Sequence, residues 1–503
     1  MTFLDKIKEN FTRFKDRNAF FIGDKFFTYD ELNKVVCATG NVIQSNLPGR
    51  QNPIGVITNN DIETYGSILA IWFTRNIFVP LNPRNPVSRN LEIIKQAGIH
   101  TILTSGKSDH DPLHTIDVQT IQTKVQEQNK KLYLSVPDKG AKKDILYLLF
   151  TSGSTGKPKG VPISRENLDS FIRGFISFGY EFTPEDRFLQ IYDLSFDASV
   201  HCYTVPLVTG SCIYTVPQDE IKYLYALKLM KNHDLTFVKM PPSTLAYLRP
   251  YFKGIRLEKL KYCLFGGEAL DWTLVSNWSE CVPNARIQNV YGPTEATINC
   301  LIYDWDKNRQ DKHYNGIVSI GKPFGENKAF IADANHKQIE PGRMGELYVT
   351  GPQITPGYWK NPGKNKRSFI ELLYNRKKER FYKTGDLAII DQEGDFLFCG
   401  RVDEQVQIDG FRVELGEIEH HARKFLKGCN VSALAVTGKQ QTMEIHLFIE
   451  NITVKKDELK KYLESRLPVY MQPVKIYQIK EFPKSAGGKV NKKCLKLKIP
   501  EMP

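Results

Sequence analysis

The chain has 503 residues, enough for roughly three domains or for one large core and a smaller domain. Hydrophobic residues make up 41% and charged residues 25%, and no segment approaches the ~18 consecutive apolar residues of a membrane span, so we expect a globular protein without membrane insertion. The net charge of +13 indicates solubility or an acidic partner, while the absence of an arginine-rich tract argues against nucleic-acid binding. The nine cysteines are scattered and form no Cys-x-x-Cys, which argues against a disulfide framework or a zinc site.

The first 140 residues alternate helical stretches with short apolar strands. Residues 1–17 mix acidic and basic side chains and lack the apolar core of a signal peptide, so a cytoplasmic protein is expected. Residues 53–58 and 76–81 are short and apolar and read as strands. This rhythm predicts an α/β arrangement with parallel strands.

A glycine-rich loop follows the buried strand predicted at residues 144–150, and a helix is expected around 168–174. The loop, residues 151–160, reads TSGSTGKPKG. Its glycines allow close backbone approach, and its hydroxyls, freed N–H groups and two lysines suit a triphosphate. It is not a Walker A loop, because Thr151 stands where that pattern needs glycine and Pro158 follows Lys157.

Turn-forming residues become frequent near residue 400, and we place a domain boundary at 400–404. Residues 383–386, 391–394 and 399–403 read as turns. Beyond the boundary, the sequence predicts helices at 415–424 and 455–466, strands near 433–436 and 444–449, and a basic tail at 480–497. The predicted domains are therefore 1–400 and 401–503. Residues 417–421 (EIEHH) look like a metal site but are read as a polar helix face.

Ordered segments along almost the whole chain resemble the adenylate-forming (AMP-binding) superfamily. Besides the glycine-rich loop, the matching segments are 79–89, 266–270, 289–295, 345–348, 382–386, 400–403 and 487–489. The resemblance is closest to D-alanine–carrier-protein ligases and stand-alone adenylation domains of nonribosomal peptide synthetases. It implies a large N-terminal multi-subdomain α/β core with a small, mobile α+β C-terminal domain.

The same resemblance implies an ATP site with Mg²⁺. Tyr291 would stack on adenine, Thr294 would contact the α-phosphate and Glu295 would hold Mg²⁺, a hard cation that takes oxygen ligands. Asp386 would accept from the ribose hydroxyls, with Arg401 nearby. The full expected set is Thr151, Ser152, Gly153, Ser154, Thr155, Gly156, Lys157, Gly267, Glu268, Asn289, Val290, Tyr291, Gly292, Pro293, Thr294, Asp386, Arg401 and Lys489.

Lys489 lies among glycines, in a segment able to project it into a cleft. By resemblance it bridges the substrate carboxylate and the α-phosphate, where charge develops in the transition state. Thr294 and Glu295 complete the expected catalytic residues. Asp403 matches the hinge about which the C-terminal domain rotates after adenylation.

The segment 195–199 determines the expected substrate class. In amino-acid-activating relatives its aspartate, here Asp197, pairs with the substrate α-ammonium; the alternative is an Asp197 that only caps the helix start. The remaining expected substrate-binding residues are Ala198, His201, Leu264, Gly266, Val290, Ile298, Asn299 and Lys489. His201 is either a core histidine or a substrate contact. Gly266 stands where D-alanine ligases commonly have cysteine, which predicts more room.

Three hypotheses follow. The first is a ligase that activates a small amino acid, D-alanine among the candidates, and passes it to the phosphopantetheine thiol of a carrier protein in trans. The second is an acyl- or aryl-CoA ligase, which keeps the nucleotide residues and has no use for the charge of Asp197. The third is a non-catalytic nucleotide-binding protein, against which Lys489, Glu295 and Asp386 argue.

Overall fold

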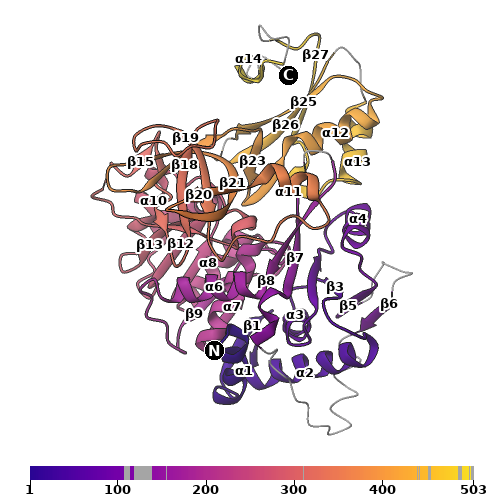
Figure 1. The fold of residues 1–503 in the computed structure, drawn as a ribbon, viewed down its shortest axis with the longest axis vertical. Coiled ribbons are helices and arrows are strands. Elements are labelled where there is room, and N and C mark those ends of the chain that lie inside the picture. The colour runs from indigo at the N-terminus through magenta and orange to yellow at the C-terminus, as the bar shows by residue number, and fades with distance from the viewer. Residues whose placement is uncertain are drawn as a thin grey trace. The chain divides into compact units, whose positions relative to one another are not determined.

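The computed structural model describes residues 1–106, 114–117, 139–153, 156–309, 311–438, 440, 442–450, 455–484, 490–497 and 499. The chain forms two compact units (Figure 1). The first comprises residues 1–83, 94–149 and 160–402; the second comprises 84–93, 150–159 and 403–503. The sequence boundary between them at 402–403 lies inside the region where we expected a domain boundary, and the division into 1–400 and 401–503 stays a prediction.

A nine-stranded sheet forms the centre of the first unit, in the order β17-β14-β13-β12-β11-β9-β10-β1-β2. The strands from β13 to β1 pair in parallel, and the outer pairs are antiparallel. The bounds are β1 Asn18–Ile22, β2 Lys25–Thr28, β9 Arg187–Gln190, β10 Cys212–Thr215, β11 Phe237–Met240, β12 Tyr262–Gly266, β13 Arg286–Tyr291, β14 Leu301–Asp304 and β17 Lys322–Pro323.

A six-stranded sheet has the order β6-β5-β3-β4-β7-β8. Its strands are β3 Pro53–Ile57, β4 Ile77–Leu81, β5 Thr101–Thr104, β6 His114–Asp117, β7 Ile145–Thr151 and β8 Lys159–Ser164. The strands that we predicted at 53–58, 76–81 and 144–150 correspond to β3, β4 and β7. They pair in parallel across β3, β4 and β7, as the α/β rhythm of the sequence indicated.

A five-stranded antiparallel sheet contains β18 Lys328–Ala332, β19 Gly345–Thr350, β20 Phe369–Tyr374, β21 Lys377–Ile390 and β22 Phe396–Arg401, and a small ribbon pairs β15 His313–Tyr314 with β16 Ile317–Val318. The prediction of a turn at 383–386 is wrong, because these residues lie inside β21. Glycine is typical of turns, but here Gly385, with a positive φ of 74°, lies inside a strand. The strand is irregular at this point, since its pairing with β19 shifts register between Glu346 and Tyr348.

Helices cover both faces of the nine-stranded sheet. Several begin with capping boxes, such as Thr2 with Asp5 in α1 and Ser164 with Asn167 in α6, which satisfy the free N–H groups of the first turn. Phe237 of β11 packs in one hydrophobic core and Val238 in the other, as strand alternation requires. The helices are α1 Phe3–Arg13, α2 Tyr29–Asn46, α3 Ile62–Phe73, α6 Arg165–Ile176, α7 Asp197–Thr209, α8 Lys222–Asn232, α9 Pro242–Leu248, α10 Trp272–Ser279 and α11 Pro362–Ser368, with α4 Val87–Ala97 shared between the units.

The second unit has its own core, formed by a helix pair and a three-stranded sheet. Its elements are β23 Gln405–Ile408, β24 Phe411–Glu414, α12 Leu415–Phe425, β25 Val431–Thr437, β26 Met443–Glu450, α13 Lys456–Glu464, β27 Lys475–Ile479 and α14 Lys492–Leu497. The interpretation of 417–421 as a polar helix face is wrong for Glu417, which is fully buried and forms an ion pair with Arg89 at 2.7 Å. None of the described helices is long and apolar enough to cross a membrane.

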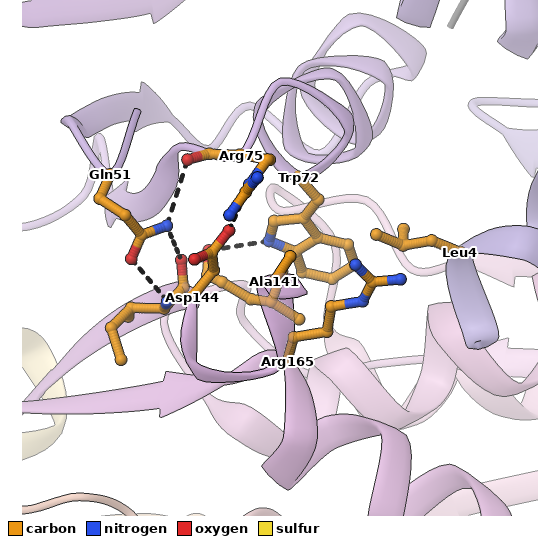
Figure 2. A pocket seen from close by; sticks show the side chains of 9 residues that line it. Leu4, Gln51, Trp72, Arg75, Ala141, Asp144 and Arg165 are labelled. Carbon is orange, nitrogen blue, oxygen red and sulfur yellow. Dashed lines mark hydrogen bonds and ion pairs between the residues drawn. The ribbon is translucent and has the colours of Figure 1, made fainter. Parts of the chain in front are cut away.

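A narrow buried crevice of the first unit lies beside Trp72 (Figure 2). Polar groups that line it pair with one another: Arg75 with Asp144 at 2.6 Å, and the Trp72 indole N–H with the Leu146 carbonyl at 2.9 Å. It has no interior space large enough for a water molecule. The crevice is therefore a packing feature and not a ligand site.

Candidate active site

The carboxyl ends of β11, β12 and β13 bring several predicted residues together. Lys239 on β11 is in register with Leu264 on β12, and Gly266 is in register with Val290 on β13. Residues paired in register on neighbouring strands share one face of a sheet. In open α/β sheets, ligands bind outside the carboxyl ends of the strands, so this edge of the nine-stranded sheet is the candidate site.

Tyr291, Asp386 and Arg401 form one polar group in the first unit. Tyr291 ends β13, and its hydroxyl donates to Asp386 Oδ2 at 2.5 Å. Asp386 lies opposite Arg401 on the paired strands β21 and β22, and the Arg401 guanidinium forms an ion pair with Asp386 Oδ1. The structure therefore brings these three predicted residues together. Their roles toward adenine and ribose stay predictions.

Thr294 and Glu295 lie just beyond β13 in the 3₁₀ helix η3 (Thr294–Ala296). The Glu295 side chain is fully buried, and its Oε1 accepts a hydrogen bond from the Tyr358 hydroxyl at 2.6 Å. Together with Tyr291, Asp386 and Arg401, these two residues make up what we call the Tyr291 cluster.

The fit of Glu295 to Mg²⁺ follows from its donor chemistry. Within the described ranges, no group of three or more His, Cys, Asp or Glu side chains is poised to hold a metal. Magnesium bound to nucleotides commonly takes one or two carboxylates, phosphate oxygens and waters. Glu295 thus fits a metal that arrives with a triphosphate and does not fit a metal held by protein ligands alone.

A strained turn follows η3 and positions Ile298 and Asn299. Thr297 and Ile298 have positive φ angles of 55° and 73°, which β-branched residues rarely adopt. Gln353 holds the turn, since its Nε2 donates to the carbonyls of Ala296, Thr297 and Asn299 at 3.2, 3.2 and 2.7 Å. The turn passes so close to Gly292 that a Cβ there would lie 2.5 Å from the Asn299 Cα. Gln353 therefore fixes two predicted substrate residues.

Asp197 is the first residue of α7. The N-cap position is Phe196, with no side-chain cap bond, so the alternative that Asp197 serves as the N-cap is wrong. The Ala198 N–H and the Thr294 side chain lie near its carboxylate and oppose the rise of its pKa. Its Oδ2 is shielded from solvent and has no hydrogen-bond partner among the described residues. Burial raises the pKa of Asp197 to about 6, against the opposing effect of the Lys239 charge.

Lys239 is the functional candidate that sequence reasoning missed. It is 1% exposed on the central strand β11. Its Nζ lies 3.1 Å from His201 Nδ1 on α7. The Asn299 amide is oriented so that its nitrogen donates to the Ile298 carbonyl, and its oxygen then accepts from the Lys239 ammonium at 3.1 Å. Burial lowers the pKa of Lys239 to about 8. We call Asp197, His201, Lys239 and Asn299 the Lys239 cluster.

His201 packs among the rings of Phe171, Phe175 and Phe237, with centroids 5.4, 4.3 and 5.7 Å from its own. Burial, followed by the Lys239 charge, lowers its pKa well below the usual value, so the imidazole is neutral. A neutral ring that accepts at Nδ1 carries its proton on Nε2. His201 is therefore a buried core histidine that contacts Lys239, and its contact with a substrate stays a prediction.

Gly266 does not leave the extra space that we predicted from a glycine at this position. A Cβ at this position would lie 2.7 Å from both Val290 Cγ2 and the Val290 carbonyl oxygen. The space beside Gly266 is therefore filled by the neighbouring strand. Leu264 and Val290 are buried and face the same core as α7.

The other predicted nucleotide residues of the first unit border the same strand ends. Glu268 Oε2 accepts from the Ser243 N–H at 2.7 Å, and the Asn289 amide donates to the Ser319 carbonyl at 2.9 Å. Gly267 has a positive φ of 84° directly after β12, and Pro293 precedes η3.

The glycine-rich loop belongs to the second unit and is described only in part. The Ser152 hydroxyl donates to the Arg412 carbonyl at 2.8 Å, and the Gly153 N–H donates to Glu417 Oε2 at 3.1 Å. A backbone N–H that binds a carboxylate has the chemistry to bind a phosphate oxygen. Of the other predicted loop residues, Thr151 ends β7, Gly156 has a φ of 79° and Lys157 is exposed. The predictions for Ser154, Thr155 and Lys489 lie outside the described residues.

Two further residues were missed, Gln353 and Tyr358. Both lie in a loop far along the chain from their partners. Gln353 follows Asn299 by 54 residues, and Tyr358 follows Glu295 by 63 residues. Neither carries a local pattern that signals its partner. Lys239 did carry a signal, namely a charge inside an otherwise apolar strand.

Comparison with known proteins identifies the family. The profile of the family described as "AMP-binding enzyme" matches residues 7–359, and the chain belongs to this family. It is 29% identical over 500 residues to a component of linear gramicidin synthase from Brevibacillus parabrevis, covering 97% of this chain but only 9% of that protein. The expected superfamily and its α/β fold are thereby confirmed.

Two solved structures share the fold. One is holo-PA1221, an NRPS protein containing adenylation and PCP domains, with a TM-score of 0.86 at 23% identity, covering 98% of this chain and 84% of that one. The other is the Vibrio cholerae adenylation domain AlmE in complex with glycyl-adenosine-5'-phosphate, with a TM-score of 0.85 at 23% identity, covering 99% and 98%.

Proposed function

We propose that the protein activates an amino acid as its aminoacyl-adenylate and then transfers it to the phosphopantetheine thiol of a carrier protein in trans. A carboxylate oxygen of the amino acid attacks the α-phosphorus of ATP, the bond to the β-phosphate oxygen breaks, and pyrophosphate leaves. The thiol sulfur then attacks the acyl carbon, and AMP leaves with the electrons of the broken bond.

The observation that carries this proposal is that Asp197 Oδ2 has no hydrogen-bond partner in the described part of the chain. A shielded carboxylate oxygen without a protein partner is costly unless a ligand supplies a positive or donating group. The α-ammonium of an amino acid is such a group. Thr294 lies near the same carboxylate and belongs to the predicted nucleotide residues, so the amine and the α-phosphate would both lie close to its hydroxyl.

The Tyr291 cluster would hold the nucleotide. Asp386, already an acceptor for Tyr291 and Arg401, has the chemistry to accept ribose hydroxyls. Glu295 would hold Mg²⁺, which supplies charge neutralisation at the phosphates when bound. Lys489 would stabilise the charge that develops at the α-phosphorus. A carrier as acceptor is supported by the fold shared with an adenylation–PCP protein. A hinge at Asp403 and a cytoplasmic location stay predictions.

The test is the exchange of labelled pyrophosphate into ATP, screened with all common amino acids in both enantiomers, D-alanine included, and with uncharged carboxylic acids plus coenzyme A. We expect exchange that depends on one amino acid and loading of that amino acid onto a holo carrier. Exchange only with acids that lack an amine, coupled to coenzyme A, would replace the proposal with the acyl- or aryl-CoA ligase. Nucleotide binding without turnover of any acid would contradict both enzyme hypotheses.

A further inference from the structure

Lys239 holds a buried positive charge for which the described part of the chain supplies no close counter-ion. The ammonium is 1% exposed in the middle of the nine-stranded sheet. Its two hydrogen-bond partners, His201 Nδ1 and the Asn299 amide oxygen, are neutral acceptors. An ammonium has three N–H donors, so one donor and the full charge remain for another group.

Among the described residues, Asp197 is the carboxylate whose charge acts on Lys239, and the geometry argues against a closed ion pair. Among the described residues, no carboxylate oxygen lies within ion-pair distance of the Lys239 ammonium, although the Asp197 charge acts on it from further away. Asp197 Oδ2 is shielded and unpartnered within the same part of the chain. Two opposite charges thus remain apart. The other titratable groups that interact with them are Glu295, Tyr147 and Tyr192 for Asp197, and the Cys202 thiol and His201 for Lys239.

The cluster is mounted rigidly, as a recognition site requires. Lys239 belongs to a parallel strand paired on both sides, and His201 is fixed by three phenylalanine rings on its own side of the sheet. Asn299 is fixed through Gln353, which donates to its carbonyl at 2.7 Å. Side chains locked by packing and hydrogen bonds hold a ligand more tightly than mobile ones, because little freedom is lost on binding.

We propose that Lys239 recognises the substrate side chain and that the substrate is an amino acid whose side chain ends in a carboxylate. This inference rests on the proposed function. Asp197 would take the α-ammonium, Lys239 the side-chain carboxylate, and the α-carboxylate would remain for adenylation. Both buried charges then gain a partner of opposite charge, and the one charge left over on the substrate is the α-carboxylate that is adenylated.

Charge balance distinguishes this substrate class from others. The methyl group of D-alanine would place an apolar surface against the Lys239 ammonium, and the charge of Lys239 would remain without a counter-ion. A cationic side chain would add a like charge next to Lys239. An amide or hydroxyl would accept one hydrogen bond without neutralising the ammonium, so we expect it to bind much less tightly.

The decisive experiment is amino-acid-dependent pyrophosphate exchange with the unaltered protein. Acidic amino acids of different side-chain length are compared with their side-chain amides and with alanine, each in both enantiomers. We expect kcat/KM for one acidic amino acid to exceed that for its amide by about a hundredfold or more, the effect of leaving a buried charge unpaired. A preference for a neutral or cationic side chain overturns the inference while the proposed function stands. Absence of exchange with every amino acid overturns the proposed function itself.

Variants at position 239 sharpen the result. Lys239→Met should lose about a hundredfold or more with the acidic amino acid and reverse the acid-to-amide ratio, because it removes the charge but keeps the volume. Lys239→Arg keeps the charge and should retain part of the acidic preference. Lys231→Met, at an exposed position on α8, is the matched control and should leave both rates unchanged. An acid-to-amide ratio that Lys239→Met does not alter contradicts the role of Lys239.

Discussion

The Tyr291 cluster and the Lys239 cluster both include residues on or next to the parallel strands β11 and β13, but they differ in how their charges are paired. In the Tyr291 cluster, the protein supplies partners: Arg401 and Tyr291 for Asp386, and Tyr358 for Glu295. In the Lys239 cluster, as far as the described residues go, Asp197 keeps a shielded oxygen without a partner and Lys239 has only neutral acceptors.

The difference suggests separate roles for the two clusters in the proposed reaction. The Tyr291 cluster, which we propose holds ribose and Mg²⁺, would make the same contacts with the nucleotide for any acid substrate. Buried charges that lack partners gain much more from a ligand of matching charge. Specificity should therefore come from the Lys239 cluster.

The largest expected effect is that of Asp197→Asn, which keeps the shape and removes the charge. The substrate ammonium would then be buried opposite a neutral amide, and Lys239 would lose the carboxylate charge that acts on it from α7. We expect kcat/KM for exchange to fall about a thousandfold. Asp234→Asn, at an exposed position with a φ of 47° that asparagine tolerates, is the control. A loss of less than about fivefold would show that Asp197 does not hold the amine.

Glu295→Gln addresses the other cluster. It preserves the hydrogen bond from Tyr358 and removes the charge proposed for Mg²⁺, so we expect exchange to fall about a hundredfold and the half-saturating Mg²⁺ concentration to rise. The preference among amino acids should not change. The measurement is exchange against Mg²⁺ concentration, with the exposed Glu340→Gln as control. An altered amino-acid preference with an unaltered Mg²⁺ requirement would reverse the roles assigned to the two clusters.

Gln353→Ala tests whether the strained turn at Thr297 and Ile298 depends on the hydrogen bonds that Gln353 donates to it. The substitution leaves buried carbonyls of Ala296, Thr297 and Asn299 without their donor, at a cost of about 3 kcal/mol in the free energy of unfolding. Urea titration measures the loss, with Gln338→Ala at an exposed position as the control. A change below about 1 kcal/mol would mean that the turn holds its conformation without Gln353.

The smallest expected effect is the pH dependence of kcat/KM. Burial raises the pKa of Asp197 to about 6 and lowers that of Lys239 to about 8. Asp197 binds the amine as a carboxylate and Lys239 binds a carboxylate as an ammonium, so activity should rise as the pH increases through about 6 and fall as it passes about 8. Rates measured over roughly pH 5 to 9 test this. A flat profile would contradict the assignment of either group to substrate binding.

The sequence predicted the Tyr291 cluster well because a short motif carries it. Tyr291, Thr294 and Glu295 lie within five consecutive positions. The proximity of Asp386 and Arg401 was implied by the resemblance alone, and the pairing of β21 with β22 that joins them was not predicted. The same reasoning took residues 383–386 for a turn, since a positive-φ glycine inside a bulged strand has the local composition of a turn.

What the sequence did not predict depends on distant partners. Lys239 lies in a four-residue buried strand, and its meaning emerges only when α7 brings His201 to it and the turn after η3 brings Asn299. Gln353 and Tyr358 support the site from a loop without a motif of its own. The space beside Gly266 is likewise decided by Val290 on the adjacent strand, which a single position cannot reveal.

The central claim is that an ion pair between the Asp197 carboxylate and a substrate amine defines what this enzyme activates. The most direct measurement compares pyrophosphate exchange for the preferred amino acid with that for the same acid lacking its α-amine, in the unaltered protein. We expect kcat/KM to drop about a thousandfold when the amine is absent. Equal rates for the two acids would contradict the claim.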